Sequence, residues 1–277
     1  MTEPLRIGAA GMGLNTTTML LMSAHGELPP LDFGIFSNTK AEGAELMEHF
    51  RWMRSGNVLP YPLLETSAGD LRESVLLSAE TGVRVSNPPF YSLTNGKKGQ
   101  LNRSCTRDFK IYPVQRMARQ LHEQLRGKIY PGCIEIWIGI CAEETQRYSV
   151  VSPKYITIRH PFLERATRPV GGTGLWMTRR DCEAWLIKHG YPVPGKSACT
   201  FCPFRSNENW RRMRDTDQEA WQDAIRVDRA IRGGLYNTTA DALFVHRDCV
   251  PLEQADIEAP DLGDDLFNNE CSGMCAS

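Results

Sequence analysis

The chain has 277 residues and a formal net charge of −1 at pH 7, with 41% hydrophobic and 23% charged residues. This composition is typical of a soluble globular protein, and it gives no overall electrostatic basis for binding nucleic acid, which would need a local basic patch. The amino-terminal residues lack the apolar core of a signal peptide, and no apolar run is long enough to span a bilayer. We therefore expect a cytoplasmic protein without a membrane partner, whose nine cysteines serve metal binding or thiol chemistry rather than disulfides.

A glycine-rich turn follows the first apolar run. Residues 5–10 predict a strand, residues 11–18 form the turn, and residues 19–22 begin a helix-like stretch. A strand, a glycine-rich turn and a helix together offer backbone N–H groups and a positive helix end to a phosphate. The turn lacks the Gly-Lys-Ser/Thr of a Walker A loop and the third glycine of a dinucleotide fingerprint, so a tight turn without a ligand stays the alternative.

A second strand is expected over residues 31–36, followed by a polar turn at 37–42 and a helix to about residue 54. Further strands are expected at 82–86 and 133–140. Strands that alternate with helices predict a parallel sheet covered on both faces, and ligands of such sheets bind beyond the carboxyl ends of the strands. The turns at 11–18 and 37–42 can therefore face one pocket.

Cys105 lies among cations at the end of a loop rich in proline, glycine and asparagine, just before a helix that runs to about residue 125. Arg103, Arg107 and Lys110 would lower the pKa of its thiol or hold an anionic ligand. The alternative is an ordinary helix start with solvated charges. Cys141, at the end of the strand at 133–140, is ambiguous between core packing and a role as a further metal ligand.

Cys199 and Cys202 form a CxxC pair at a turn between two expected helices, a capped one beginning at Thr178 and a long one over 207–232. Both thiolates of such a pair can point to one side of the turn, but a tetrahedral ion or a cluster needs three or four ligands. The arginines concentrated in residues 205–214 are the candidate contact to nucleic-acid phosphates. They are Arg205, Arg211, Arg212 and Arg214.

The tail from residue 251 is acidic, has no lysine or arginine, and carries Cys271 and Cys275. Thiols on a mobile tail are suited to carrying sulfur or electrons into an active site, and a frayed end with incidental cysteines is the alternative. We expect an α/β domain over residues 1–165, a helical region with the CxxC turn over 166–250, and this tail over 251–277.

Five segments, in this order along the chain, resemble the phosphoadenosine phosphosulfate reductase family. This family belongs to the adenine-nucleotide α-hydrolase-like group, with the PP-loop ATP pyrophosphatases, and the similarity is to its phage-type branch. The segments are the phosphate loop at 10–17, the second-strand motif at 36–42, the Cys-x-x-x-x-Lys-x-x-Pro element at 105–113, the CxxC pair, and Glu-Cys-Ser-Gly at 270–273.

The resemblance implies an α/β fold with an open, mostly parallel five-stranded sheet, helices on both faces, and a small helical carboxyl-terminal region that contains cysteines. It implies ATP or another adenine nucleotide at the carboxyl edge of the sheet, with Mg²⁺ as an optional companion. The nucleotide-binding residues it indicates are Gly11, Gly13, Asn15, Thr16, Thr17, Asn38, Thr39 and Glu42.

The resemblance also implies an iron–sulfur cluster of the 4Fe-4S type held by Cys105, Cys199 and Cys202. Related reductases with a cluster have two adjacent cysteines where this chain has Ser104 and Cys105, so one ligand is missing and one iron is left open. Some tRNA-thiolating relatives use such an iron to carry sulfur. The catalytic roles implied are phosphate orientation by Arg107 and Lys110 and delivery of sulfur by Cys271 or Cys275.

Three functions stay open. The first is ATP-dependent sulfur transfer to a nucleoside or nucleic acid, with a sulfur or thiol donor protein as partner. The open iron favours it, although Asn15 replaces the acid expected where ATP is split to AMP. The second is thiol-dependent reduction of adenylyl sulfate or phosphoadenylyl sulfate, in which Cys271 attacks the sulfonate sulfur. The third is a zinc-stapled nucleic-acid-binding protein. The sequence does not determine the oligomeric state.

Overall fold

Five parallel strands form the central sheet of the computed structural model, which describes residues 3–148, 150–168 and 170–261. Across the sheet the strands are β3 (Leu63–Thr66), β2 (Phe33–Ser37), β1 (Leu5–Ala9), β6 (Ile134–Trp137) and β7 (Ile156–Arg159). The chain steps outward from β1 to β3 and then returns to the other side of β1, so the strand order reverses between β1 and β6. The expected α/β fold with an open, five-stranded parallel sheet is confirmed.

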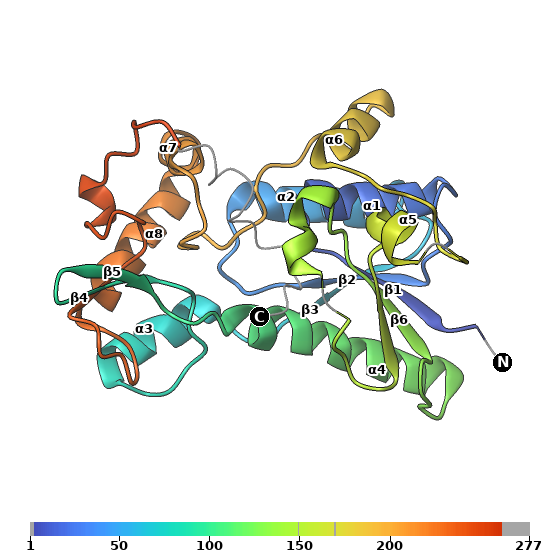
Figure 1. The fold of residues 1–277 in the computed structure, drawn as a ribbon, viewed down its shortest axis with the longest axis horizontal. Helices are drawn as coiled ribbons and strands as arrows, with labels where there is room; N and C mark the ends of the chain where they lie inside the picture. The colour runs from blue at the N-terminus through green and yellow to red at the C-terminus, as the bar shows by residue number, and fades with distance from the viewer. Residues whose placement is uncertain (1–2, 149, 169, 262–277) are drawn as a thin grey trace.

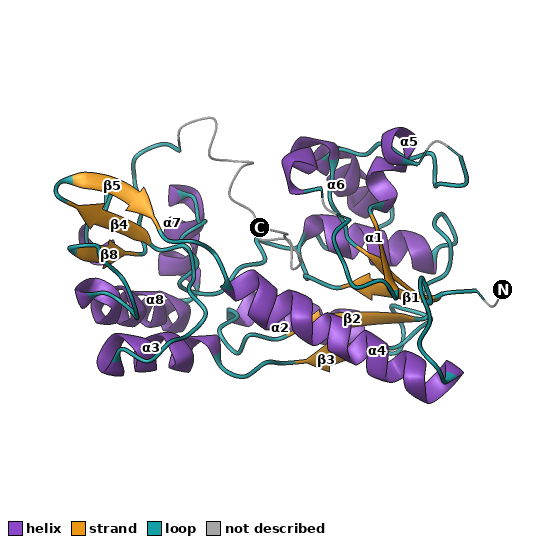
Figure 2. Cartoon of the chain, turned by 60° about the horizontal axis from the view of Figure 1, so that its bottom comes forward, coloured by secondary structure: helices purple, strands orange, loops and turns teal. Residues whose placement is uncertain are grey.

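Helices cover both faces of this sheet. Helices α1 (Leu14–Ala24) and α2 (Ala44–Arg54) lie on one face, and α4 (Tyr112–Arg126) crosses the other (Figures 1 and 2). The first of these packs closely because β1 carries Gly8, where a β-carbon would lie 2.6 Å from a methyl group of Leu20. Helix α6 (Arg179–Lys188) packs on the outer side of α1, and the short α5 (Glu164–Thr167) precedes it.

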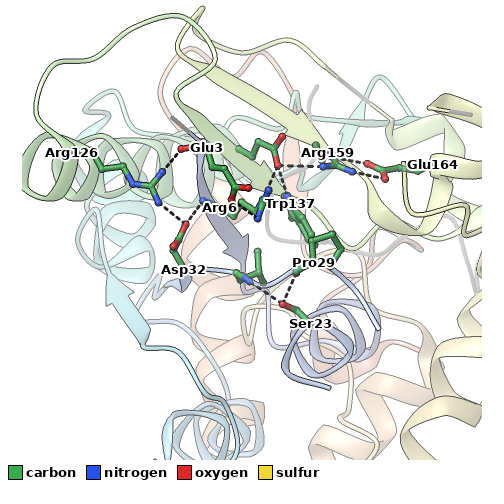
Figure 3. Close-up of polar contacts among 11 residues, drawn as sticks. Glu3, Arg6, Ser23, Pro29, Asp32, Arg126, Trp137, Arg159 and Glu164 are labelled. Atoms are coloured by element: carbon green, nitrogen blue, oxygen red, sulfur yellow. Dashed lines mark hydrogen bonds and ion pairs between the residues drawn. The ribbon is translucent and has the colours of Figure 1, made fainter. Parts of the chain in front are cut away.

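A buried ion-pair network fixes the edge strand β7. The guanidinium of Arg159 lies between Trp137 and Glu164 (Figure 3), with 2.6 Å from its Nη2 to Oε2 of Glu164. Its Nη1 lies 3.3 Å from Oε2 of Glu135, and its guanidinium carbon lies over the Trp137 ring, 5.3 Å from the ring centroid. A buried charge is tolerated only when it is paired in this way, so the network ties β7 to β6.

A second unit lies at one end of the sheet and joins segments that are distant in sequence (Figure 2). It contains a small antiparallel sheet in the order β5 (Lys97–Gln100), β4 (Tyr91–Thr94), β8 (Ala242–Phe244), and the helices α3 (Leu71–Thr81), α7 (Asn207–Thr216) and α8 (Gln218–Ala230). Its apolar core includes Leu71 and Val75 as well as Trp210 and Ile225. The expected ranges 1–165 and 166–250 therefore both contribute to this unit.

The local structure differs from the sequence-based expectation in several places, and two of the five sheet strands, β3 and β7, were not assigned from the sequence. The strand expected at 82–86 is absent from this described segment, because Gly82 ends α3 in a left-handed conformation (φ 67°) and an irregular segment follows. The expected long helix is two helices, because the backbone bends at Asp217 (φ −140°), whose carboxylate caps α8 by accepting the Ala220 N–H at 3.0 Å. The expected loop at 87–100 contains the β4–β5 hairpin, whose turn residues Asn95 and Gly96 both have positive φ.

The remaining helical segments are short. They are the π-helical turn η1 (Arg107–Ile111) and the 3₁₀ segments η2 (Ala142–Arg147), η3 (Pro161–Leu163), η4 (Ile231–Gly233) and η5 (Leu252–Gln254). Among the helices of the described residues, none has the length and apolar character needed to cross a membrane.

Candidate functional site

The glycine-rich turn joins β1 to α1 at the carboxyl edge of the sheet. Gly13 is the N-cap of α1, and its carbonyl accepts the Thr17 N–H at 2.9 Å and the Thr16 hydroxyl at 3.1 Å. The hydroxyl of Ser197, two residues before the CxxC pair, donates to the carbonyl of Gly11. The expected phosphate loop therefore lies directly against the segment that leads into the CxxC turn, with the positive end of α1 beside it.

Asn15 faces away from this turn toward the neighbouring strand β6. Its Nδ2 donates to Oε2 of the buried Glu144 at 2.7 Å, and Gly139 lets the two segments meet because a β-carbon there would lie 3.0 Å from the Asn15 backbone. An aspartate at position 15 would place two carboxylates in contact. The structure thus gives a packing reason for asparagine at position 15, where the sequence resemblance led us to expect an acid.

The second polar turn, after β2, leads to the CxxC pair. The hydroxyl of Thr39 donates to Oε1 of Glu42 at 2.9 Å and lies 3.2 Å from Sγ of Cys199. Asn38 instead shapes the turn itself, since its Nδ2 donates to Oε1 of Glu65 at 2.8 Å and its Oδ1 accepts the Lys40 N–H at 2.7 Å. Of the residues expected to bind nucleotide, Thr39 and Glu42 therefore lie beside Cys199.

The three cysteines expected to be metal ligands line one small cavity. Cys105 approaches from the start of η1, and Cys199 and Cys202 approach from the CxxC turn, with Lys110 and Arg103 in the same wall. The cavity has a volume of about 20 Å³, which is room for about one water molecule. Among the residues that the structure describes, no disulfide joins these cysteines to one another.

Burial raises the pKa of the Cys199 thiol well above its ordinary value, the Glu42 carboxylate raises it further, and the Lys110 ammonium opposes both. Cys199 is therefore a neutral thiol at pH 7 in the protein without metal, and a metal that binds it must displace its proton. Two buried polar atoms near this turn, Oε2 of Glu42 and Nε of Arg205, have no hydrogen-bond partner among the described residues.

The chemistry of this donor set fits a sulfur-rich metal centre, because three thiols are accompanied by cationic side chains that balance their charge. A single zinc ion, with bonds of about 2.3 Å, needs its sulfur ligands within about 4.6 Å of one another. Within the described ranges, the cysteines do not form a group whose ligand atoms all lie within 4.8 Å. The wider spacing suits a polynuclear group better, and the lining side chains must separate to admit one.

Lys110 and Arg107 belong to the same π-helical turn but face different surroundings. Lys110 is buried, and it also lines a second cavity of about 10 Å³ formed by the ends of β1 and β2, including Gly11 and Ser37. Arg107 is exposed and paired with Asp108 at 2.8 Å. Such π turns recur at functional sites. Nothing in the sequence indicated this turn, which places Lys110 between the cysteine cavity and the phosphate loop.

A much larger cavity of about 660 Å³ opens beside the phosphate loop, between α2, residues 192–198 and α7. Met12 of the phosphate loop and Ala198 of the CxxC segment both line it, together with Lys196, His49 and Trp52. Its size is that of a typical ligand site. Burial lowers the pKa of His49 to about 4, so this side chain is neutral at pH 7, and its Nε2 lies 2.8 Å from the Thr17 hydroxyl.

The arginines of residues 205–214 all have partners within the chain. Arg205 is buried, donates to the carbonyls of Ala198 and Cys199 at 3.0 Å each, and stacks on Trp210. The others contact the Ile257 carbonyl (Arg211), Glu45 (Arg212), and Asp215 and Glu258 (Arg214). Nucleic-acid contact through this segment stays a prediction, and the exposed Arg212 would have to leave Glu45 to make it.

The remaining cysteines of the expected chemistry lie elsewhere. Cys141 is buried in the core, with its Sγ 3.4 Å from that of Cys182 on α6, and it does not line the cysteine cavity. Cys271 and Cys275 lie outside the described residues.

Comparison with known proteins gives one weak likeness. No family model matches the chain, and no curated protein matches it. Among solved structures, a phosphoadenylyl-sulfate (PAPS) reductase from Candida auris, solved as a phosphate complex, is 14% identical over 70% of this chain and 76% of that chain, with a TM-score of 0.40. This likeness assigns no function to the chain, and the α/β fold is evident from the parallel sheet itself.

Proposed function

We propose that this protein is an enzyme of the phosphoadenosine phosphosulfate reductase family that uses ATP to transfer sulfur to a nucleoside or nucleic acid. The observation that carries the proposal is the position of Lys110, which lines both the cavity of Cys105, Cys199 and Cys202 and the cavity at the ends of β1 and β2. A nucleotide at the phosphate loop and sulfur chemistry at the cysteines would share this one cation.

Adenine-nucleotide binding is supported by the arrangement around α1. Backbone N–H groups at the start of this helix are the kind of donor that binds phosphate. Lys110 and Lys196 add positive charge on either side of the loop. The large cavity beside Met12 offers room for the target that receives sulfur.

The proposed reaction has two steps. An oxygen of the target attacks the α-phosphorus of ATP, and pyrophosphate leaves with the electrons of the broken P–O bond. A sulfur nucleophile then attacks the activated carbon, and AMP leaves with the target's oxygen. The residues of this chain hold the nucleotide, neutralise the phosphate charge through Lys110, and exclude water from the activated target.

The cysteine centre would hold an iron–sulfur cluster through Cys105, Cys199 and Cys202, and the cluster, when bound, supplies a site that accepts sulfur from a donor protein. Thr39 and Glu42 contact or lie beside Cys199, so they would set the orientation and charge of this ligand. Cys271 and Cys275 remain candidates for carrying the sulfur.

Anaerobic purification followed by iron and sulfide analysis tests the centre. We expect iron, acid-labile sulfide and a brown chromophore in the parent protein, and loss of most of the iron in Cys105→Ser. The matched control is Cys133→Ala, which changes a buried cysteine in the core of the sheet and should keep its iron. Zinc without sulfide in the parent protein would contradict the proposed centre and support the zinc staple.

Nucleotide chemistry is tested with the same protein, ATP and candidate nucleoside or RNA targets. We expect AMP and pyrophosphate in equal amounts, and nucleotide binding about tenfold weaker in Lys110→Met, since one charge-assisted contact is worth roughly 1.5 kcal/mol. Lys128→Met, which changes an exposed lysine beyond α4, should bind normally. Sulfite release from phosphoadenylyl sulfate without AMP formation from ATP would contradict sulfur transfer and favour the reductase.

A further inference from the structure

We propose that His25, Glu27 and His189 form a second metal site, which takes a divalent transition-metal ion of the zinc class. His25 and Glu27 belong to the turn that ends α1, and His189 is the C-cap of α6. One ligand atom of each residue lies within 4.8 Å of the other two, and Nε2 of His189 lies 3.6 Å from Oε1 of Glu27. This site is separate from the cysteine cavity and independent of the proposed function.

The spacing is close to what an ion requires. Bonds of about 2.0–2.2 Å to nitrogen and oxygen hold ligand atoms at most about 4.3 Å apart, and closer in tetrahedral geometry. Rotation of exposed side chains is enough to close the remaining gap, because His25 and Glu27 are exposed and His189 is half-buried. The same exposure lets an ion enter from solvent.

Each of the three ligands already has an outer partner that orients it. Nδ1 of His189 lies 2.8 Å from the Trp185 carbonyl, which makes Nδ1 an N–H donor, so Nε2 is the ring atom that faces Glu27 and would bind the ion. The Trp185 indole N–H donates to both carboxylate oxygens of Glu27, at 3.1 and 3.0 Å. Nε2 of His25 lies 2.8 Å from the Tyr191 hydroxyl. Outer partners of this kind typically accompany ligands in metal sites.

The donor set selects the metal. Two imidazoles and one carboxylate suit Zn²⁺, Co²⁺ and similar ions, whereas the thiols of the cysteine cavity suit iron–sulfur chemistry. Three protein ligands leave a further coordination position for water. The aromatic rings of Trp185 and Tyr191 form a wall around the site, with His189 stacked on Trp185 at 3.9 Å.

An ion here would tie α6 to the end of α1. His189 ends α6, and the chain then runs through Tyr191 into the segment whose Ser197 contacts Gly11. The ion would therefore fix the starting point of the segment that covers the phosphate loop. Its expected effect is structural, through the position of residues 190–198.

Titration of untagged protein with Co²⁺, a spectroscopic substitute for Zn²⁺, tests the site. We expect one equivalent to produce visible d–d bands without thiolate-to-cobalt charge-transfer bands, and two paramagnetically shifted imidazole N–H proton signals. Affinity should fall at least about tenfold in His25→Ala and Glu27→Gln, and His25→Ala should lose one N–H signal. The matched control is Glu183→Gln, an exposed carboxylate on α6, which should bind Co²⁺ as the parent does.

Two results would overturn the proposal. One is a Co²⁺ affinity and d–d spectrum that are the same in His25→Ala and in the parent protein. The other is a spectrum of only thiolate charge-transfer bands, which would place the bound ion at cysteines. Because neither variant changes the cysteine cavity or the phosphate loop, failure here leaves the proposed function untouched.

Discussion

Two pairs of cysteines that are close in space have opposite surroundings. Cys199 and Cys202 lie at a turn beside a cavity that Lys110 and Arg103 also line. Cys141 and Cys182 face each other at 3.4 Å in the apolar core between the sheet and α6, and both are fully buried. Their mutual hydrogen bond and burial raise the pKa of the Cys141 thiol.

The difference shows that proximity of thiols does not by itself make a metal or redox site. A reactive or ligating cysteine needs a route for the other reactant and a cation that stabilises the thiolate. Burial and a carboxylate oppose ionisation in both places, but only at the cysteine cavity does a cation, Lys110, act against that rise in the pKa of a thiol. The causes that act on Cys141 in the core are its partner Cys182, burial and the carboxylates of Glu143 and Glu144. We therefore assign the core pair to packing and keep the cavity as the proposed site of the chemistry.

Alkylation gives the largest expected contrast between the two pairs. In native protein without metal, iodoacetamide should modify Cys105 and Cys202 at least about a thousandfold faster than Cys141 and Cys182. The half-buried thiols react directly, while the core thiols react only after an opening that costs roughly 4 kcal/mol or more. Peptide mass spectrometry over a time course measures the four rates.

Unfolded protein is the control, since all four thiols should react at similar rates in concentrated urea. Alkylation rates in native protein that lie within a factor of ten of one another would contradict this prediction. They would mean that the core around Cys141 and Cys182 opens as readily as the cavity.

The next largest expected effect is a loss of stability on changing Glu144, which lies in the core beside Cys141. Its buried carboxylate accepts hydrogen bonds from the Asn15 amide and the Cys141 N–H and pairs with Arg147. Glu144→Gln keeps the shape and removes the charge, which should lower the free energy of unfolding by about 3 kcal/mol because the buried ion pair with Arg147 is lost. Urea unfolding measures it.

The matched control is Glu143→Gln, one residue away. The Glu143 carboxylate accepts the Arg179 N–H at 3.2 Å and is partly exposed, so we expect a loss below about 1 kcal/mol. Equal losses of unfolding free energy in the two variants would show that the buried Glu144 carboxylate does not stabilise the core around Cys141 more than the partly exposed Glu143 does.

The sequence predicted three of the five strands of the sheet because their signals are local, whereas β3 and β7 were not assigned. Apolar runs bounded by glycine-rich turns mark β1, β2 and β6, and a Thr178 N-cap marks α6, where the structure has the predicted start with its side chain accepting the Asp181 N–H. The order of the motifs suggested that Cys105 and the CxxC pair act together, and the fold brings Cys105 to the CxxC turn. Their role as metal ligands stays a prediction.

Signals that depend on distant partners were not visible in the sequence. Asn15 and Glu144 are 129 residues apart, and His25 and His189 meet only because α6 packs on α1. Arg205 stood out as a positive charge for nucleic acid, but burial directs it to the carbonyls of the CxxC turn. A sequence shows charge and local periodicity, and burial depends on the whole fold.

The smallest expected effect is a pH dependence of stability that comes from two buried histidines. Burial lowers the pKa of both His49, in the wall of the large cavity, and His160, in the closed core beside Tyr148, to about 4 from 6.5. A folded-state pKa below the unfolded value contributes stability that is complete above pH 6.5 and is lost as the pH falls toward 4, because the unfolded chain binds the proton more readily.

Between pH 7.5 and 5.5, the parent protein should therefore lose about 1 kcal/mol more stability than His49→Gln, and His160→Gln should behave likewise. Urea unfolding at the two pH values measures this difference. If the stability of His49→Gln and of the parent protein falls equally with pH, then His49 takes up a proton in the folded state through the cavity. Of the two histidines, only His160 would then contribute to this pH dependence.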